Sequence, residues 1–276
     1  MLPSVSIVIP AHKATFFAEA LASACLQASS IPCEVLVGDD SGSAEIENIC
    51  RSMKEQFPAP IKYFKNKIPL GEVGNLKNLI NAASADIIKP LYDDDVLAPN
   101  AVFEMVTALL QSPNVAFVTT NRATINEESL LIEAPHELAY KKICEQKALV
   151  SGLSALKVLA TRAVNFIGEP SCVCFRKDRF IGLGDSFNLI NENIFTGLGD
   201  LTIWVNLIGS SFDDFVYLPQ TLAFHRLHTG SQTDKVESFG VDFSDEFSLE
   251  IMRHFGVDPF PTEKNLLDRL EKKLLF

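Results

Sequence analysis

Apolar and polar positions follow two different periods along the first half of the chain. Short runs rich in Val and Ile, which are typical of buried strands, precede longer segments with apolar residues at helical spacing. The pattern predicts strands over residues 4–10, 34–38, 61–65, 86–92 and 114–120, and helices over residues 14–28, 71–84 and 99–110. Strands that alternate with helices form βαβ units, so we expect an α/β fold with a Rossmann-type mixed, mainly parallel sheet flanked by helices.

The second half of the chain predicts more helix than strand. Residues 145–159 and the apolar run that begins at Gly199 have helical spacing. The last part of the chain predicts a helical C-terminal appendix, because the leucines of residues 263–276 fall on one face. That face would pack on the body or on a second subunit, or lie on a membrane surface. The pattern therefore divides the chain into a main domain, 1–239, and an appendix, 240–276.

Composition indicates an ordinary globular protein. The chain has 276 residues, of which 47% are hydrophobic, which is enough for a full core in one unit. Its 24 basic and 35 acidic residues give a net charge of −11, which disfavours a nucleic-acid surface. Six cysteines without a C-x-x-C pair indicate reduced thiols, and we identify neither a signal peptide nor an uncharged run of ~18 residues. A cytoplasmic location is expected, with the inner face of the membrane as an alternative.

Three consecutive aspartates, Asp93, Asp94 and Asp95, follow the strand predicted over residues 86–92. Adjacent carboxylates repel one another unless water or a hard cation takes up their charge, and Mg²⁺ and Mn²⁺ bind oxygen ligands of this kind. The alternative is an acidic turn or the cap of a helix that begins near Pro99. A cap needs one aspartate rather than three, so the cluster is a candidate metal site.

A second acidic pair, Asp39 and Asp40, follows the strand predicted over residues 34–38. The carboxyl ends of neighbouring parallel strands share one edge, where α/β folds bind their ligands. The shared edge favours one site over two unrelated acidic turns. The first strand is not followed by G-x-G-x-x-G, and residues 71–78 lack the spacing of a P-loop. A nucleoside diphosphate bound here would therefore depend on a metal for charge neutralisation.

Four sequence blocks, taken in order, resemble the family-2 glycosyltransferases of the GT-A fold. They are residues 6–12 (SIVIPAH), 34–43 (EVLVGDDSGS), 74–78 (GNLKN) with 85–88 (ADII), and 93–99 (DDDVLAP). Any one block is a weak signal, whereas the ordered set, over about residues 4–110, is a strong one. The resemblance implies an inverting glycosyltransferase that moves a sugar from a nucleotide-diphosphate donor to a hydroxyl acceptor.

The resemblance also implies roles for individual residues. Asp39 or Asp40 would read the base and ribose of the nucleotide sugar, and the aspartate cluster would hold the diphosphate through Mn²⁺ or Mg²⁺. Tyr92 stands where many members carry the first acid of a D-x-D pattern, and Lys77 replaces a common arginine. Which carboxylate contacts the metal therefore stays open. The residues expected to bind the nucleotide sugar are Pro10, Ala11, His12, Asp39, Asp40, Asn75, Lys77, Asp93 and Asp94.

The second half resembles the family's pattern of a short strand, a turn and an acid that opens a buried helix. By that match Asp200 is the general base, the carboxylate that removes the proton of the acceptor hydroxyl. From the residues alone, Asp200 is more simply an N-cap, because it precedes the apolar run 201–208. The two roles are compatible, since capping would hold the carboxylate in place.

His228 lies in a segment that resembles the R-x-H sequence with which some relatives complete the metal shell. The expected metal site is therefore Asp93, Asp94, Asp95 and His228, and imidazole suits Mn²⁺ better than Mg²⁺. Exposed polar histidines are the alternative. If His228 binds the metal, His225 is expected to point the other way, because side chains alternate along a strand.

The resemblance divides the main domain into a nucleotide-sugar-binding half, 1–122, and an acceptor and catalytic half, 123–239. The expected partners are a nucleotide-diphospho-sugar donor and a saccharide or lipid-linked acceptor, such as a bacterial surface polysaccharide, without nucleic acid. A homo-oligomer and peripheral membrane contact through the C-terminal helix are further options. Two alternative functions stay open. One is a sugar nucleotidyltransferase, disfavoured because no glycine-rich basic loop would grip a triphosphate, and the other is a non-catalytic nucleotide-sugar-binding module.

Overall fold

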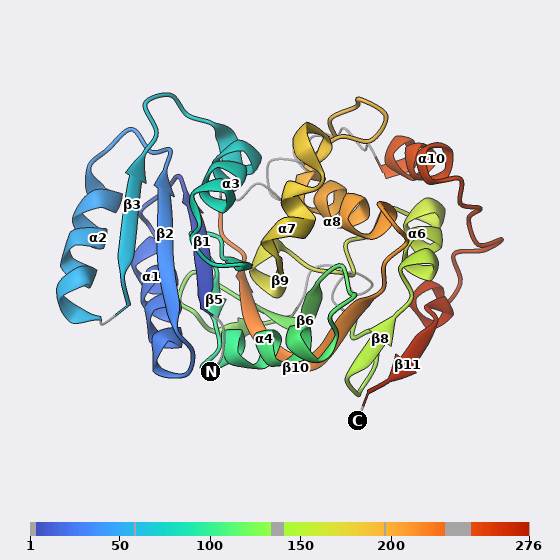
Figure 1. Ribbon diagram of the computed structural model, residues 1–276, viewed down its shortest axis with the longest axis horizontal. Coiled ribbons are helices and arrows are strands. Elements are labelled where there is room, and N and C mark those ends of the chain that lie inside the picture. Colours follow the sequence, from blue (N-terminus) through green and yellow to red (C-terminus); the bar gives the residue numbers. More distant parts are fainter. Residues whose placement is uncertain (1–3, 58, 134–140, 196, 230–243, 276) are drawn as a thin grey trace.

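The computed structural model describes residues 4–57, 59–133, 141–195, 197–229 and 244–275. Strands and helices alternate in its first half, as the apolar pattern predicts (Figure 1). These elements are β1 (Val5–Ala11), α1 (Phe17–Leu26), β2 (Cys33–Asp39), α2 (Glu45–Gln56), β3 (Ile61–Lys65), α3 (Gly71–Ala82) and β4 (Ile87–Pro90).

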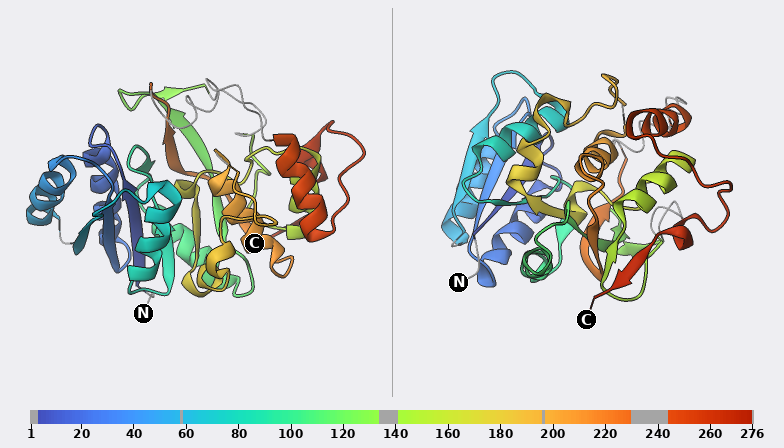
Figure 2. Two further views of the ribbon diagram at one scale, coloured as in Figure 1. Left: turned by 90° about the horizontal axis from the view of Figure 1, so that it is seen from above. Right: turned by 45° about the vertical axis from the view of Figure 1, so that its right-hand side comes forward.

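The four strands of this half are parallel and lie in the order β4-β1-β2-β3. Every residue of β1 and β2 is buried, because helices cover both faces of a parallel sheet. The chain reverses its direction across the sheet between β3 and β4. Right-handed crossovers therefore put α1 and α2 on one face and α3 on the other, as Figure 2 shows.

The second half extends the same sheet through longer connections. Its elements are β5 (Val96–Leu97), α4 (Ala101–Gln111), β6 (Val118–Ile125), β7 (Leu131–Ile132), β8 (Ala148–Val150), α6 (Gly152–Thr161), β9 (Val173–Arg176), α7 (Lys177–Ile181), α8 (Gly199–Gly209), β10 (Phe215–Arg226), α10 (Ser244–Phe255) and β11 (Lys272–Leu274).

The described strands form one sheet of 11 strands, in the order β11-β8-β10-β6-β9-β4-β1-β2-β3, with β5 beside β10 and β7 beside β6. The parallel pairings join four to eight residues of each strand. Each antiparallel pairing joins only two or three. The predicted α/β fold with a mixed, mainly parallel sheet is therefore confirmed.

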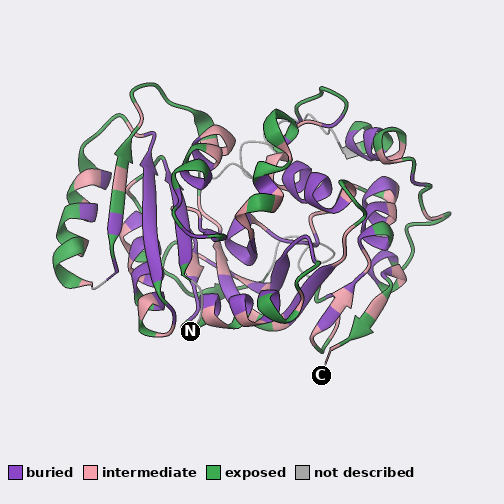
Figure 3. Cartoon of the chain, in the orientation of Figure 1, coloured by how far each residue is buried: buried purple, intermediate pink, exposed green. Residues whose placement is uncertain are grey.

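The core is continuous from the first half to the second. Buried residues concentrate in β1, β2 and α8 (Figure 3). Trp204 of α8 packs its ring 5.7 Å from that of Phe117 and 6.3 Å from that of Phe175, measured between centroids. All six cysteines are free thiols, consistent with the expectation of reduced cysteines.

Two element boundaries differ from the predicted ones. The strand predicted over residues 114–120 is β6, which starts and ends later because its parallel partner β10 runs beside it as far as Ile125. The helix predicted over residues 145–159 begins only after β8. Its start is decided by Ser151, whose side chain accepts a hydrogen bond from the backbone N–H of Ser154 and caps α6.

The C-terminal segment differs most from its prediction. Its first part is helical, because it contains α10, which packs against α6. The helix predicted over residues 263–276 is wrong. Leu266–Arg269 form a 3-10 turn (η4), and β11 then pairs with β8, whose edge would otherwise be unpaired. Leu266, Leu267 and Leu270 are buried in the core, so these leucines do not face a bilayer. Residues 239 and 240, the predicted domain boundary, lie outside the described residues.

Within the described part of the chain, no helix combines the length and the apolar character needed to cross a bilayer.

Replacing Leu270 with alanine should lower the free energy of unfolding by about 2–5 kcal/mol, because this side chain is only 3% exposed and its removal leaves a cavity. Leu274→Ala is the matched control, since Leu274 is 43% exposed, and it should change stability by less than about 0.5 kcal/mol. Urea denaturation followed by tryptophan fluorescence measures both. Equal losses in the two variants would contradict the packing of the tail on the body.

Candidate active site

The ends of four strands meet at one edge of the sheet. β1, β2 and β4 are parallel, so their carboxyl ends share that edge. The loop after β4 carries the aspartate cluster and leads into β5, which pairs antiparallel with the end of β10. This register, Phe224 opposite Val96, brings the segment that carries His225, Arg226 and His228 beside the aspartates.

Asp93 forms hydrogen bonds with the backbone of the loop that follows β1. Its Oδ2 accepts hydrogen bonds from the backbone N–H groups of His12 (2.7 Å) and Lys13 (2.9 Å). Burial and the neighbouring charge of Asp94 raise the pKa of Asp93 to about 6. Asp93 therefore joins the carboxyl ends of β1 and β4, two parts of the predicted nucleotide-sugar site.

Asp94 pairs with His228. Its Oδ2 lies 3.1 Å from His228 Nε2, and this contact raises the pKa of the imidazole. The ring of Phe16 packs beside that of His228, with 5.0 Å between the ring centroids. The side chain of Asp94 is 25% exposed, whereas that of His228 is 8% exposed and its Nδ1 lies 3.1 Å from the carbonyl oxygen of Thr229. Asp94 therefore offers an oxygen at the surface of the site, and His228 Nε2 would bind a metal in place of its contact with Asp94.

Asp95 is turned into the protein and is fully buried. Its Oδ2 accepts a hydrogen bond from Ser171 Oγ, and its Oδ1 accepts one from Arg226 N at 3.0 Å. Oδ1 also lies 3.3 Å from His225 Nδ1. Burial alone would lower the pKa of His225, but the charges of Glu169 and Asp95 raise it to about 9. Both oxygens of Asp95 are thus engaged by protein groups.

The two histidines contact different aspartates of the cluster, His225 the buried Asp95 and His228 the partly exposed Asp94. The strand ends at Arg226, so strand alternation does not extend to His228. Arg226 itself is fully buried and holds the loop backbone, because its Nε donates to the carbonyl of Asp94 at 2.8 Å. Its Nη2 contacts Glu19 of α1 at 2.6 Å.

Asp39 ends β2 and is fully buried. Oδ1 accepts from Ser41 N at 2.7 Å, and Oδ2 accepts from Tyr63 Oη at 2.6 Å and Lys65 Nζ at 3.0 Å. Burial alone would raise the pKa of Asp39, but these hydrogen bonds hold it below its usual range. Asp39 is therefore ionised at neutral pH and oriented at the end of β2.

Asp40 and Asn75 brace the turns around this end of the sheet. The carboxylate of Asp40 accepts from Asn66 Nδ2 at 2.6 Å and from Leu70 N at 2.9 Å. Asn75 Nδ2 donates to the carbonyl of Gly38 at 2.7 Å. The two segments are so close that a Cβ on Gly38 would come within 2.1 Å of Asn75 Oδ1, which only glycine avoids.

The other residues predicted to bind the nucleotide sugar, Pro10, Ala11 and Lys77, lie in two different places. Pro10 and Ala11 end β1 and are buried, and the carbonyl of Ala11 accepts from Asp40 N at 2.8 Å, so both stand beside the aspartates. Lys77 instead reaches from α3 to the second half, where its Nζ pairs with the exposed Asp185 at 2.8 Å.

Asp200 lies in the first turn of α8, but it is not the N-cap, which is Leu198. Its Oδ1 accepts from the backbone N–H of Leu201 at 2.7 Å, and its Oδ2 accepts from Asn165 Nδ2 at 2.8 Å. The helix start thus holds the carboxylate without the capping bond that the sequence alone favours. Both oxygens keep a free lone pair, so the group can still accept a proton.

Burial, followed by the charges of Glu169 and Glu72, raises the pKa of Asp200 to about 7. A carboxyl group with this pKa can serve as a general base at neutral pH. Tyr92 donates its hydroxyl hydrogen bond to Glu72. Burial and the charges of Glu72, Asp200 and Asp95 raise the pKa of the Tyr92 phenol.

The donor set fits a metal that is completed by substrate. Within the described ranges, no three His, Cys, Asp or Glu side chains are arranged to hold a metal ion by themselves. Mg²⁺ and related ions commonly use one or two protein ligands and take the others from water and substrate phosphates. Asp94 suits that role because its side chain is partly exposed, and His228 Nε2 lies beside it, 3.1 Å from Oδ2.

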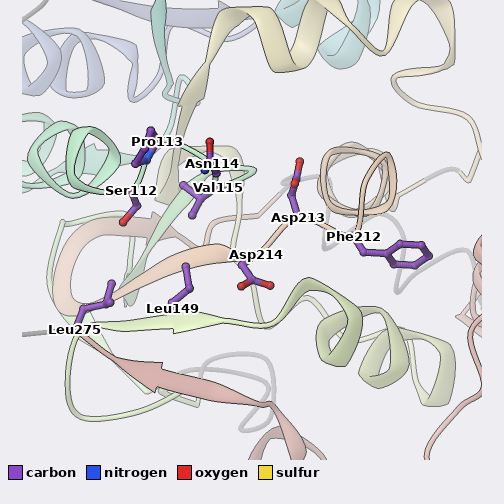
Figure 4. Close-up of a pocket in the computed structure, with 9 residues that line it drawn as sticks. All are labelled: Ser112, Pro113, Asn114, Val115, Leu149, Phe212, Asp213, Asp214 and Leu275. Atoms are coloured by element: carbon purple, nitrogen blue, oxygen red, sulfur yellow. The ribbon is translucent and has the colours of Figure 1, made fainter.

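A hollow of about 380 Å³ lies elsewhere (Figure 4). It is lined by the residues that precede β6, such as Asn114 and Val115, and by Phe212, Asp213 and Asp214, which precede β10. Because β6 and β10 are parallel, this is the amino edge of the sheet, opposite the aspartate cluster. Ligands of α/β folds bind at the carboxyl edge, so the hollow is not part of the candidate site.

Several neighbours of the site residues could not be recognised from the sequence. Glu72, Asn165 and Glu169 surround Asp200, and Ser171 binds Asp95. For Glu169 and Ser171 the sequence signal is the turn-forming run from Gly168 to Ser171, which indicates a loop but no partner, and Glu72 and Asn165 lie outside that run. Their roles depend on contacts between distant segments.

Comparison with known proteins identifies the family. The model of glycosyl transferase family 2 matches residues 6–177, more than half of the chain. Residues 1–349 of S. aureus TarS, solved with UDP-GlcNAc, share 14% identity and a TM-score of 0.64, over 95% of this chain and 69% of that one. A longer S. aureus TarS structure matches at 14% identity and a TM-score of 0.61, over 91% of this chain but only 42% of that one.

No curated protein matches the sequence. The low identity to the solved structures shows a shared fold, and the family model carries the assignment. The chain belongs to glycosyl transferase family 2, and the protein is a glycosyltransferase with a GT-A-like fold.

Proposed function

We propose that the protein transfers a sugar from a nucleotide-diphosphate donor to a hydroxyl acceptor, with inversion and with a divalent metal. The observation that carries the proposal is that one short loop binds both parts of the site. Its Ser171 contacts Asp95, next to the Asp94–His228 pair, and its Gly168 contacts Asn165, which binds Asp200, a carboxyl group of pKa about 7. One group suits proton removal and the other suits charge neutralisation, which are the two tasks of this reaction.

The nucleoside would bind over the carboxyl ends of β1 and β2, between residues 10–12 and Asp39. An ionised carboxylate accepts hydrogen bonds, so Asp39 would receive the N–H of a base such as uracil. Tyr63 and Lys65 support this role by holding Asp39 ionised and in place. Because a TarS structure of the same fold contains UDP-GlcNAc, uridine diphosphate donors are the first to test.

Asp94 and His228 would hold Mn²⁺ or Mg²⁺ together with diphosphate oxygens and water. When bound, the metal neutralises the charge that develops on the leaving diphosphate. Asp93 and Asp95 would support the site indirectly. Asp93 binds the amides of His12 and Lys13, and Asp95 binds the end of β10, so each fixes one side of the loop.

In the transfer, Asp200 takes the proton of the acceptor hydroxyl while that oxygen attacks the anomeric carbon. The new C–O bond forms on the face opposite the diphosphate. The bond between the anomeric carbon and the diphosphate oxygen breaks, and its electron pair stays on that oxygen. A single displacement of this kind inverts the configuration at the anomeric carbon.

The acceptor would be a saccharide or a lipid-linked saccharide, such as a precursor of a bacterial surface polysaccharide. Support for a lipid-linked acceptor comes from the hairpin of β6 and β7, where Leu130 and Leu131 are 63% and 70% exposed. The same hairpin is tied to the aspartate loop, because Arg226 Nη1 donates to the carbonyl of Asn126 at 2.8 Å. A cytoplasmic location beside the inner membrane face would suit such an acceptor.

Titration calorimetry with UDP-GlcNAc and other nucleotide sugars, with Mn²⁺ or with a chelator, tests this function. We expect one donor to bind at least about tenfold more tightly in Mn²⁺, which corresponds to about 1.4 kcal/mol. Assays with added acceptors should then release the nucleoside diphosphate. Binding without transfer or hydrolysis would favour a non-catalytic module. Synthesis of a nucleotide sugar from a nucleoside triphosphate and a sugar phosphate would favour a nucleotidyltransferase.

A further inference from the structure

Asn165 is the side chain that holds the outer oxygen of Asp200. Its Nδ2 donates to Asp200 Oδ2 at 2.8 Å, while its Oδ1 accepts from the backbone N–H of Gly168 at 2.9 Å. A backbone N–H can only donate, so it selects the orientation of the amide. The NH₂ group of Asn165 must therefore face Asp200, and Asp200 Oδ2 must be an acceptor.

The backbone of Gly168 makes this arrangement stable. Its φ of +114° is a conformation that side chains rarely adopt, and a Cβ there would lie 2.8 Å from Cys172 Cβ. In this conformation its N–H binds Asn165, and its carbonyl accepts from Trp204 Nε1 at 2.9 Å. Asp200 and Trp204 are one turn apart on α8, so the loop from Asn165 to Gly168 forms hydrogen bonds with two side chains on the same face of that helix.

The charges around Asp200 come from several elements. Glu169 precedes the 3-10 turn at Pro170–Cys172 and Glu72 stands on α3, and both oppose ionisation of Asp200, as does burial. Arg122 of β6 favours ionisation, but its Nε is already paired with Glu169 at 2.8 Å. Tyr92 donates its hydroxyl to Glu72. Among the side chains that the structure describes, Asn165 is the one that donates a hydrogen bond directly to the carboxylate of Asp200.

We propose that Asn165 is a positioning residue that keeps Asp200 ionised and oriented toward the acceptor hydroxyl. The inference rests on the proposed role of Asp200 as the general base. Asn165 touches neither substrate nor reacting atoms and acts through Asp200. Its contribution should therefore appear in the pH dependence of catalysis rather than in donor affinity.

Asn165→Asp tests this with the change of a single group. The Oδ1 that binds Gly168 can be kept, whereas the donor toward Asp200 becomes a second negatively charged oxygen. Asn165→Ala removes the donor without adding a charge. Because a hydrogen bond to a charged group is lost, the alanine variant should raise the ionisation midpoint of Asp200 by about one pH unit, and the aspartate variant should raise it further. Asn48→Asp, on the exposed face of α2, is the matched control and should change nothing.

Two readouts separate this inference from the proposed function. ¹³C NMR of labelled aspartate carboxyl groups, assigned with Asp200→Asn, follows the midpoint of Asp200 without any reaction. The pH profile of kcat/KM follows its catalytic effect. We expect both midpoints to rise in the order parent, Asn165→Ala, Asn165→Asp, with donor KM and far-UV circular dichroism unchanged.

An unmoved NMR midpoint in both variants would overturn the role of Asn165 and leave the role of Asp200 to its own variant. An NMR midpoint that moves while the pH profile stays fixed would overturn the proposed general base. A variant that fails to fold is replaced in the comparison by the other one, since either alone predicts a shift in the same direction.

Discussion

Asp200→Asn should lower turnover by about 10²–10⁴-fold, the usual loss when a general base is removed. Asparagine keeps the shape of the side chain, and its single amide oxygen can accept from the backbone N–H of Leu201 or from Asn165 Nδ2, but it cannot take the proton of the acceptor hydroxyl. The diphosphate site is not touched, so calorimetric donor affinity should stay within about twofold of the parent. Steady-state kinetics and donor titrations measure the two effects.

Asp178→Asn is the matched control, because Asp178 stands in the first turn of α7, a comparable position, but is exposed. It should keep its turnover. If Asp200→Asn retained more than about a tenth of the parent rate, Asp200 would be a residue of the helix start alone and the base would be another group.

The same residue gives this prediction a pH signature. Asp200 must be ionised to act as a base, and its pKa is about 7, so kcat/KM should rise with pH to about 7 and then level off. Stability should move in the opposite direction. The folded pKa is raised above the unfolded value, so the folded state binds the proton more tightly and the parent loses stability as pH rises from about 4 to 7. The Asp200→Asn variant lacks this ionisable group, so the difference between its melting temperature and that of the parent should shift in favour of the variant as pH rises from about 4 to 7.

Asp94→Asn should weaken nucleoside diphosphate binding in Mn²⁺ by at least about tenfold, while affinity in a chelator stays unchanged. The amide is a poorer ligand for a hard cation than the carboxylate, and it also weakens the contact with His228. His228→Ala should act in the same direction. Titration calorimetry with UDP in Mn²⁺ and in EDTA measures each variant.

Asp86→Asn is the control for this experiment, because Asp86 is exposed and precedes β4 at the opposite edge of the sheet. Asp95→Asn distinguishes a ligand from a support. Both oxygens of Asp95 accept protein hydrogen bonds, so that variant should lower the melting temperature. Normal UDP affinity of Asp94→Asn in Mn²⁺ would remove Asp94 from the metal site.

The apolar pattern was sufficient to predict the first half of the fold. β3 begins and ends at the predicted residues 61 and 65, and β1, β2 and α3 lie within two residues of their predicted bounds. Burial in a parallel sheet requires continuous apolar strands separated by helices, and this pattern is local in sequence. The placement of Asp39 and the aspartate cluster at one edge follows from the same alternation.

The pattern failed where the partner of a segment lies far along the chain. The leucines of residues 263–276 suit a helix by spacing, yet the segment completes the sheet beside β8, because an unpaired strand edge offers hydrogen bonds that a surface helix does not. The first part of the helix predicted over residues 145–159 is instead strand β8, because these residues pair with β10 on one side and β11 on the other.

The sequence by itself determined the fold class, the family resemblance and the edge of the sheet where the acidic residues gather. Only the tertiary structure decided how three adjacent aspartates differ. Asp93 binds amides 81 and 80 positions away, Asp95 binds Ser171 76 positions away, and Asp94 contacts His228 134 positions away. It also gave Asp200 a pKa of about 7 through burial and the charges of Glu169 and Glu72. Ionisation and free ligand positions depend on burial and on the groups that surround a side chain, and these are brought together only when distant segments pack.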